Sequence, residues 1–191
     1  MDDGRYHIGP APLLLAAHYQ RSLRLSDILL PTMRQLAEIS GESVSFYIRR
    51  ESVRVCLLRV DSKHAIRDHI LEGDVLPLHR GSGGRVLMAF SGARGEPHET
   101  IRTNFCYVSL GERDPETAGI SAPVFGAGER LVGAITLTGP RSRIDQDFMI
   151  KMRPPLLEAA ARATSGLGGD ASFLDAAAAR LESKALPAKR S

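Results

Sequence analysis

The residues best suited to chemistry in this sequence form a glycine-rich turn that leads directly into an apolar segment. Residues 78–90 read Leu-His-Arg-Gly-Ser-Gly-Gly-Arg-Val-Leu-Met-Ala-Phe. Three glycines and a serine at 81–84 would expose unpaired backbone amides at the start of a helix, and such amides bind anions. Val86, Leu87 and Phe90 then share one face of that helix. The segment predicts either an ordinary loop before a buried helix or a turn that holds a ligand, and composition alone leaves both open.

The spacing of these glycines excludes the common nucleotide-binding and hydrolase motifs. A dinucleotide fingerprint would need a glycine where Val86 stands, and the turn has no Walker lysine followed by Ser or Thr. The hydrolase motif Gly-x-Ser-x-Gly is also absent from this turn. His79 lies three positions before Ser82, but a nucleophile and its base need a distant third residue, and such a local pair is typical of a packed histidine. We therefore expect no catalytic residues, no metal site and no cofactor.

Length and composition indicate one globular domain. The chain has 191 residues, of which 43% are hydrophobic and 25% charged, and this leaves room for a peripheral helix or tail. Its 25 basic and 22 acidic residues permit nucleic-acid binding without indicating it. Cys56 and Cys106 show no metal-binding spacing, so we interpret them as reduced, buried thiols. Without a signal-peptide pattern or a long apolar run, the sequence predicts a cytoplasmic protein.

Six segments have the pattern of β-strands. Residues 43–50 alternate apolar and polar side chains, which predicts one buried face, and their short link to 53–60 predicts a hairpin. The other strands are expected over 65–71, 105–110, 119–125 and 131–138. In the last strand, Thr136 and Thr138 either line a pocket or lie on a solvated face, because threonine favours strands. Short connections require antiparallel pairing, so the predicted fold is α+β, an antiparallel sheet with helices packed on it.

Prolines set the expected limits of two helices. The helix over 26–39 should become regular only at Pro31, because a proline removes an interior hydrogen bond. The helix that begins at Asp145 should be interrupted at Pro154 and Pro155 for the same reason.

Three further segments are predicted to lie at the surface. Residues 91–104 are almost free of apolar side chains and read as a surface connection. The tail from residue 170 should form a short helix that is solvated and loosely docked. Leu13, Leu14 and Leu15 form an apolar cluster on a first helix, which predicts self-association through that helix.

Three stretches together resemble the effector-binding half of IclR-type transcriptional regulators. They lie within residues 4–9, 77–90 and 109–140, in the order in which the family has them. The resemblance spans about residues 5–168. It implies a GAF-like antiparallel sheet of about six strands, with helices on one face. The other face, together with the glycine-turn helix, would enclose a small-molecule effector.

The same resemblance implies domain limits and partners. Residues 1–9 would be the remnant of a wing strand or a linker, 10–168 the effector-binding domain, and 169–191 a partly helical tail. In the family a winged helix-turn-helix domain precedes this half and binds operator DNA as part of a dimer or tetramer. We therefore expect a homodimer or tetramer that meets operator DNA only through a domain missing from this chain, and no membrane contact.

Carried over by position, the resemblance implies a pocket for a small organic acid. We expect the ligand-binding residues to be Ser82, Gly83, Gly84, Ser109, Gly119, Thr136 and Thr138. Amides at the helix start would hold a carboxylate, and the hydroxyls would orient it.

Two features depart from the family pattern. The connection over 91–104 is shorter than usual, and Arg85 replaces the usual lysine after the turn. Two other functions stay open: a small enzyme that acts on an organic acid in the same cleft, and a pure dimerisation module. Titration with carboxylic acids beside a panel of hydrolase substrates separates all three.

Overall fold

A six-stranded antiparallel sheet forms the centre of the domain, with strand order β3-β2-β1-β6-β5-β4. The computed structural model describes residues 25–185, with side chains described up to residue 180. The strands are β1 (Ser43–Arg50), β2 (Val53–Val60), β3 (Val75–Pro77), β4 (Tyr107–Leu110), β5 (Thr117–Phe125) and β6 (Leu131–Pro140). The predicted α+β fold is therefore confirmed, as is the hairpin between the first two strands.

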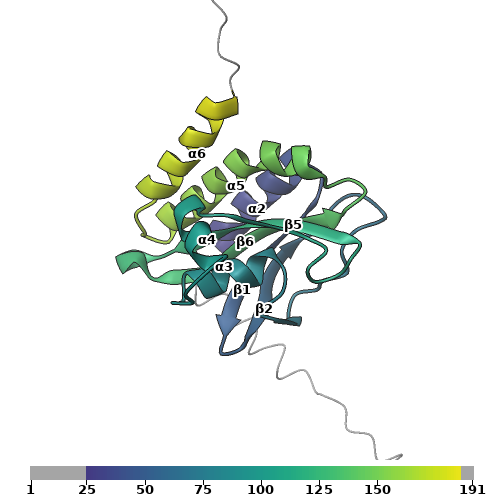
Figure 1. The fold of residues 1–191 in the computed structure, drawn as a ribbon, viewed down its shortest axis with the longest axis horizontal. Helices are drawn as coiled ribbons and strands as arrows, with labels where there is room; N and C mark the ends of the chain where they lie inside the picture. Colours follow the sequence, from purple (N-terminus) through teal and green to yellow (C-terminus); the bar gives the residue numbers. More distant parts are fainter. Residues whose placement is uncertain (1–24, 186–191) are drawn as a thin grey trace, which may run out of the picture.

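Helices cover both faces of this sheet (Figure 1). One face carries α2 (Leu25–Ser40) and α5 (Gln146–Gly166), with α6 (Ser172–Ala185) packed on α5. The other carries α3 (Ser82–Ala89), which is the glycine-turn helix, and α4 (His98–Asn104). A short 3-10 helix, η1 (Ala127–Glu129), joins β5 to β6. Within the described range, no helix is both long and apolar enough to span a membrane.

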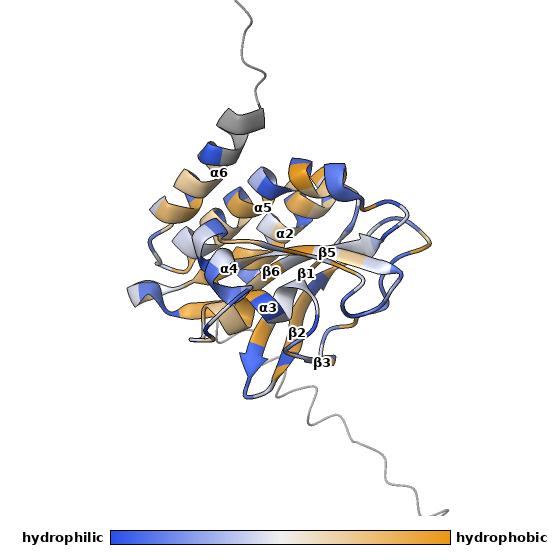
Figure 2. Cartoon of the chain, in the orientation of Figure 1, coloured by the Kyte–Doolittle hydropathy of each residue, from blue (hydrophilic) through white to orange (hydrophobic). Residues whose placement is uncertain are grey.

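Strand β1 is buried on both faces, so the prediction of a single buried face was wrong. Phe46 lies in the core under α2 and α5, whereas Tyr47 lies in a second core under α3, and both are nearly inaccessible to solvent. Val86 and Leu87 of α3 supply the cover for the second face. Figure 2 shows the apolar centre of β1 and its hydrophilic end. Polar side chains such as Ser45 were read as solvated because the sequence does not show that a helix covers them.

A register shift between β1 and β2 decides which side chains face α3. Phe46 pairs with Leu58, but Tyr47 pairs with Cys56, so one residue of β2 is left over between the two pairs. Such a bulge reverses the alternation of faces along a strand. Cys56 and Arg54 consequently point to the face under α3, although Leu58 points to the opposite core.

Prolines do not break the two long helices, contrary to prediction. Helix α2 passes through Pro31, and α5 passes through Pro154 and Pro155 without an interruption. Buried side chains lie on both sides of each proline, for example Leu29 and Met33 in α2. Packing of this continuous apolar face stabilises each helix by more than the lost hydrogen bond costs.

No strand forms over residues 65–71, and the third strand is the edge strand β3 further along the chain. Side chains hold the backbone of this segment in place of strand pairing. Arg59 donates from Nη2 to the carbonyl of Asp68 at 2.8 Å, and Arg143 donates to the carbonyl of Ile66 at 2.9 Å. Because Arg59 and Arg143 lie outside the segment itself, local alternation could not reveal these contacts.

Two segments predicted to be surface-exposed pack on the domain. The connection over 91–104 contains helix α4, whose Ile101 is fully buried. Leu174 of α6 is also fully buried, and Phe173 stacks on Phe105 with 5.1 Å between ring centroids. The expected loosely docked tail helix is therefore a packed one. The predicted first helix and its cluster at 13–15 lie outside the described residues.

Candidate ligand-binding site

Six of the seven expected site residues surround one pocket between α3 and the sheet. They are Ser82 and Gly83 of α3, Ser109 of β4, Gly119 of β5, and Thr136 and Thr138 of β6. Six others complete the lining: Tyr47, Arg54, Gly81, Arg113, Thr117 and Ala118. The open volume at its centre is about 20 Å³, which is room for about one water molecule. The structure thus brings these residues together from four elements, and their binding of a ligand remains a prediction.

Glycines allow α3 to lie close against the sheet. A Cβ at Gly83 would come within 2.9 Å of the Thr136 hydroxyl oxygen, and one at Gly119 within 3.1 Å of the Ser82 hydroxyl oxygen. Gly84 is not among the lining residues, because it packs behind the pocket, where a Cβ would clash with the carbonyl oxygen of Leu78. The glycine pattern therefore reflects close packing of helix and sheet as well as an open turn.

The first turn of α3 leaves its amide dipoles unneutralised. No side chain caps the helix start at Gly81, and the first turn holds no acidic residue. Gly81 itself has φ of 76°, a backbone conformation that glycine adopts without strain. A helix start of this kind favours a negative charge nearby.

Buried hydroxyls form a chain beside the pocket. Ser121 of β5 lies 2.8 Å from Ser82 and 2.7 Å from Thr136, measured between hydroxyl oxygens, and it donates to Ser82. A hydroxyl has one proton, so Thr136 must donate to Ser121, and the proton of Ser82 is left for another acceptor. The hydroxyl of Thr138 is buried and has no hydrogen-bond partner among the described residues.

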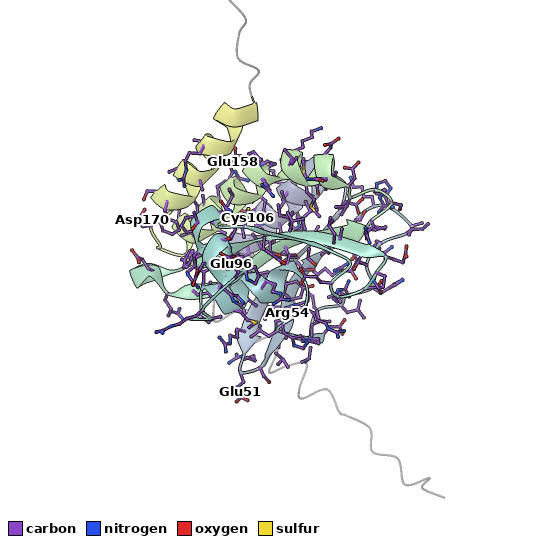
Figure 3. All side chains as sticks on the ribbon, in the orientation of Figure 1. Glu51, Arg54, Glu96, Cys106, Glu158 and Asp170 are labelled. Carbon is purple, nitrogen blue, oxygen red and sulfur yellow. The ribbon has the colours of Figure 1, made fainter. Side chains whose placement is uncertain are left out.

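Arg54 places a buried positive charge in the pocket wall, and the sequence analysis did not identify it. Its residue is 3% exposed, and Nη1 donates to the carbonyls of Pro77, at 2.7 Å, and Arg80. The guanidinium carbon lies 5.1 Å from the centroid of the Tyr47 ring, within cation–π range. Figure 3 shows Arg54 near the middle of the domain, whereas Glu51 lies at the tip of the same hairpin.

Arg54 also lacks an ion pair of its own. Across residues 25–180 it forms none, and its buried Nε has no hydrogen-bond partner there. Burial lowers the pKa of the guanidinium; the nearby charge of Arg113 also lowers it, whereas Tyr47 and the carboxylate of Asp68 oppose this shift. An arginine remains protonated despite such a shift, and the one nearby carboxylate, that of Asp68, is paired with Arg113.

Arg113 is the second charged residue of the lining, and it is neutralised. Its Nη2 lies 2.8 Å from Oδ1 of Asp68, whose side chain is 4% exposed. Oδ2 of Asp68 is buried without a hydrogen-bond partner in the described part of the chain. Burial raises the pKa of Tyr47 to about 12, so its phenol stays neutral near pH 7.

Among the charged and aromatic pocket residues that were not predicted, Arg54 alone shows a local pattern in the sequence. It is an arginine flanked by Val53 and Val55 in a strand whose only other charged residue is Arg59, which is typical of a buried polar residue. Arg113 and Tyr47 reach the pocket only through the fold. In residues 25–185, no three His, Cys, Asp or Glu side chains are grouped to hold a metal ion.

Comparison with known proteins shows which family this chain resembles. The family model described as "Bacterial transcriptional regulator IclR C-terminal" matches residues 17–101. The transcriptional repressor IclR of Escherichia coli is 24% identical over 196 residues, covering 87% of this chain and 70% of the relative. This chain is similar to the C-terminal domain of IclR-type transcriptional regulators. The resemblance inferred from the sequence is therefore confirmed.

Two other IclR-type proteins are similar to this chain. The HTH-type transcriptional regulator BhcR of Paracoccus denitrificans is 22% identical over 187 residues, covering 85% of this chain and 67% of the relative. The crystal structure of the Thermotoga maritima IclR has a TM-score of 0.74 at 16% identity, covering 88% of this chain and 78% of that chain. At this identity, the structural match shows that the two proteins share the IclR-type fold.

Proposed function

We propose that this IclR-type domain senses a small organic acid and thereby regulates transcription. The observation that carries the proposal is the buried guanidinium of Arg54, which lines the pocket and has no carboxylate partner in the described structure. A buried charge without a counter-charge is costly, commonly by several kcal/mol. A carboxylate in the pocket would supply that counter-charge, and it would accept a hydrogen bond from Nε.

Neighbouring groups suit the rest of such a ligand. The free proton of Ser82 and the amides at the start of α3 can donate to a carboxylate oxygen. Thr138 contributes a hydroxyl that has no described partner, so a ligand group can satisfy it at no cost to an existing hydrogen bond. Together these groups form the small set of convergent polar contacts that orients a ligand in a pocket.

The pocket has to widen to admit an acid larger than water. Arg54 cannot provide this movement easily, because two carbonyls and the Tyr47 ring hold it. Arg113 is 22% exposed and is held in the structure through Asp68. We propose that the more exposed part of the Arg113 side chain shifts when an acid enters, while its bond to Asp68 is kept.

Support for an enzyme in the same cleft is weaker. The Ser82 hydroxyl bonds to Ser121, and His79 is exposed, so this pair does not form a nucleophile and base. The relatives reported above are named as transcriptional regulators or repressors.

Isothermal titration tests the proposal. Acetate, butyrate and benzoate are titrated into the wild type, with acetamide, butyramide and benzamide as uncharged analogues. We expect at least one acid to bind and its amide to bind at least tenfold more weakly. Arg54→Gln should weaken binding of that acid by about ten- to a hundredfold, since hydrogen bonds to charged groups contribute roughly 1.5–3 kcal/mol.

Arg49→Gln is the matched control, because Arg49 pairs with Arg54 across the hairpin but is exposed at the surface. This variant should bind the acid as the wild type does. Circular dichroism checks the fold of both variants. Failure of all three acids to bind the wild type would overturn the proposal.

Self-association and DNA contact are proposed separately. We propose that the regulator acts as a homodimer or tetramer and contacts operator DNA through a separate helix-turn-helix domain. Sedimentation at micromolar protein concentration tests the first point, and a monomer would contradict it. A gel shift with operator and competitor DNA tests the second.

A further inference from the structure

We infer that the acid recognised by this pocket carries a single negative charge, and that Asp68 sets this selectivity. The inference rests on the proposed function and concerns the same site. Of the twelve lining residues, only Arg54 and Arg113 are charged. Asp68 neutralises Arg113 through the bond between Nη2 and Oδ1. The cluster of three side chains therefore has a net charge of +1, which one carboxylate balances.

Other ionic groups near α3 do not change this count. Arg85 and Glu112 form their own pair at 3.2 Å, and the Tyr107 hydroxyl donates to the same carboxylate. That pair is neutral as a whole and is not part of the pocket lining. The charge available to a ligand is thus that of Arg54.

Asp68 is fixed in position and cannot easily leave Arg113. Its backbone carbonyl accepts from Arg59, and its side chain is almost fully buried. The neighbouring carbonyl of Ile66 accepts from Arg143, which ties down the same segment. A second carboxylate on the ligand would either lie beside the Asp68 carboxylate or displace it from Arg113. Each alternative leaves a negative charge buried without a partner.

The effect of Asp68 on selectivity follows from Coulomb's law. Its charge repels every negative charge on the ligand, so its removal strengthens binding of a monoanion by some factor and of a dianion by roughly the square of that factor. A unit charge a few ångströms away in a partly buried site changes affinity by about tenfold or more. The affinity ratio of dianion to monoanion should therefore rise by about tenfold when Asp68 loses its charge.

The test compares matched acids that differ by one carboxylate. Acetate with malonate, butyrate with succinate, and benzoate with isophthalate are titrated calorimetrically at pH 7.5 and constant ionic strength. For the pair whose monoacid binds, the wild type should prefer the monoacid at least tenfold. Asp68→Asn should raise the ratio of diacid to monoacid affinity about tenfold, and Arg113→Gln should lower it, because it removes a positive charge.

Glu51→Gln is the matched control. It removes one negative charge from the exposed tip of the hairpin that carries Arg54, and it should leave the ratio unchanged. Thermal unfolding checks that each variant is folded, and Arg113→Gln tests the charge count independently of Asp68→Asn. A wild type that prefers the diacid, or an unchanged ratio in Asp68→Asn, overturns the inference and leaves acid binding intact. Absence of binding by every acid overturns the proposed function itself.

Discussion

The two threonines of β6 should respond in opposite ways to the same substitution. Both side chains line the pocket, and valine has nearly the shape of threonine without the hydroxyl. The Thr136 hydroxyl lies 2.7 Å from that of Ser121, whereas the buried Thr138 hydroxyl has no partner in the described residues. Replacement of Thr136 by valine removes a hydrogen bond, and replacement of Thr138 removes an unsatisfied polar group.

The expected magnitudes follow from this difference. A buried hydroxyl without a partner costs about 1–3 kcal/mol. We expect Thr138→Val to raise the free energy of unfolding by about 1 kcal/mol, at the lower end of that range. Thr136→Val should lower it by about 0.5–1.5 kcal/mol. For a chain of this size, 1 kcal/mol corresponds to a shift in Tm of about 2–4 °C.

Urea and thermal unfolding without added acid measure these changes, and calorimetric titration measures acid affinity. Thr138→Val should be more stable than the wild type and yet bind the acid several-fold to tens-fold more weakly. Thr136→Val should lose both stability and affinity. If Thr138→Val is destabilised as much as Thr136→Val, the Thr138 hydroxyl is not an unsatisfied group, and the reasoning about its role fails.

Three further outcomes are expected. Gly84→Ala should destabilise the domain by about 1–3 kcal/mol or more in urea unfolding, since its Cβ would clash with the Leu78 carbonyl, which is backbone and cannot turn away. Thr164→Val should cost about 1–3 kcal/mol in the same assay, because the threonine hydroxyl accepts from a buried backbone amide at the end of β5. Stability should fall as pH rises above about 9–10, because burial raises the pKa of Cys56 to about 11 and of Tyr47 to about 12. The unfolded chain then loses protons that the folded chain keeps, and a urea midpoint that stays constant between pH 8 and 10.5 would contradict this.

Local patterns were sufficient for most of the sheet. Alternation located β1 and β2 with the observed limits, and the glycine turn located α3. The pattern failed over 65–71, where arginines from elsewhere in the chain bind the backbone, and at the prolines of α2 and α5, where packing outweighs a lost hydrogen bond. In each case the deciding contact is made with residues outside the segment itself.

The candidate site was likewise predictable from the sequence only in part. Ser82, Gly83, Ser109, Gly119, Thr136 and Thr138 were selected from the sequence through the family resemblance, and the fold brings these six to one pocket. Their types and their order along the chain are properties of the sequence. The charge of the pocket is not, since it depends on a bulge that turns Arg54 inward and on a pairing of Arg113 with Asp68 across 45 positions.

The sequence by itself determined most of the strands, the antiparallel sheet and six of the twelve residues around the pocket, because these follow from short-range periodicity and from a recognisable order of motifs. Only the tertiary structure decided that the Thr138 hydroxyl lacks a described partner, that Arg54 has no ion pair and that Asp68 neutralises Arg113. Burial and pairing depend on all neighbours in space at once. Those neighbours are brought together only when α3 packs onto the sheet.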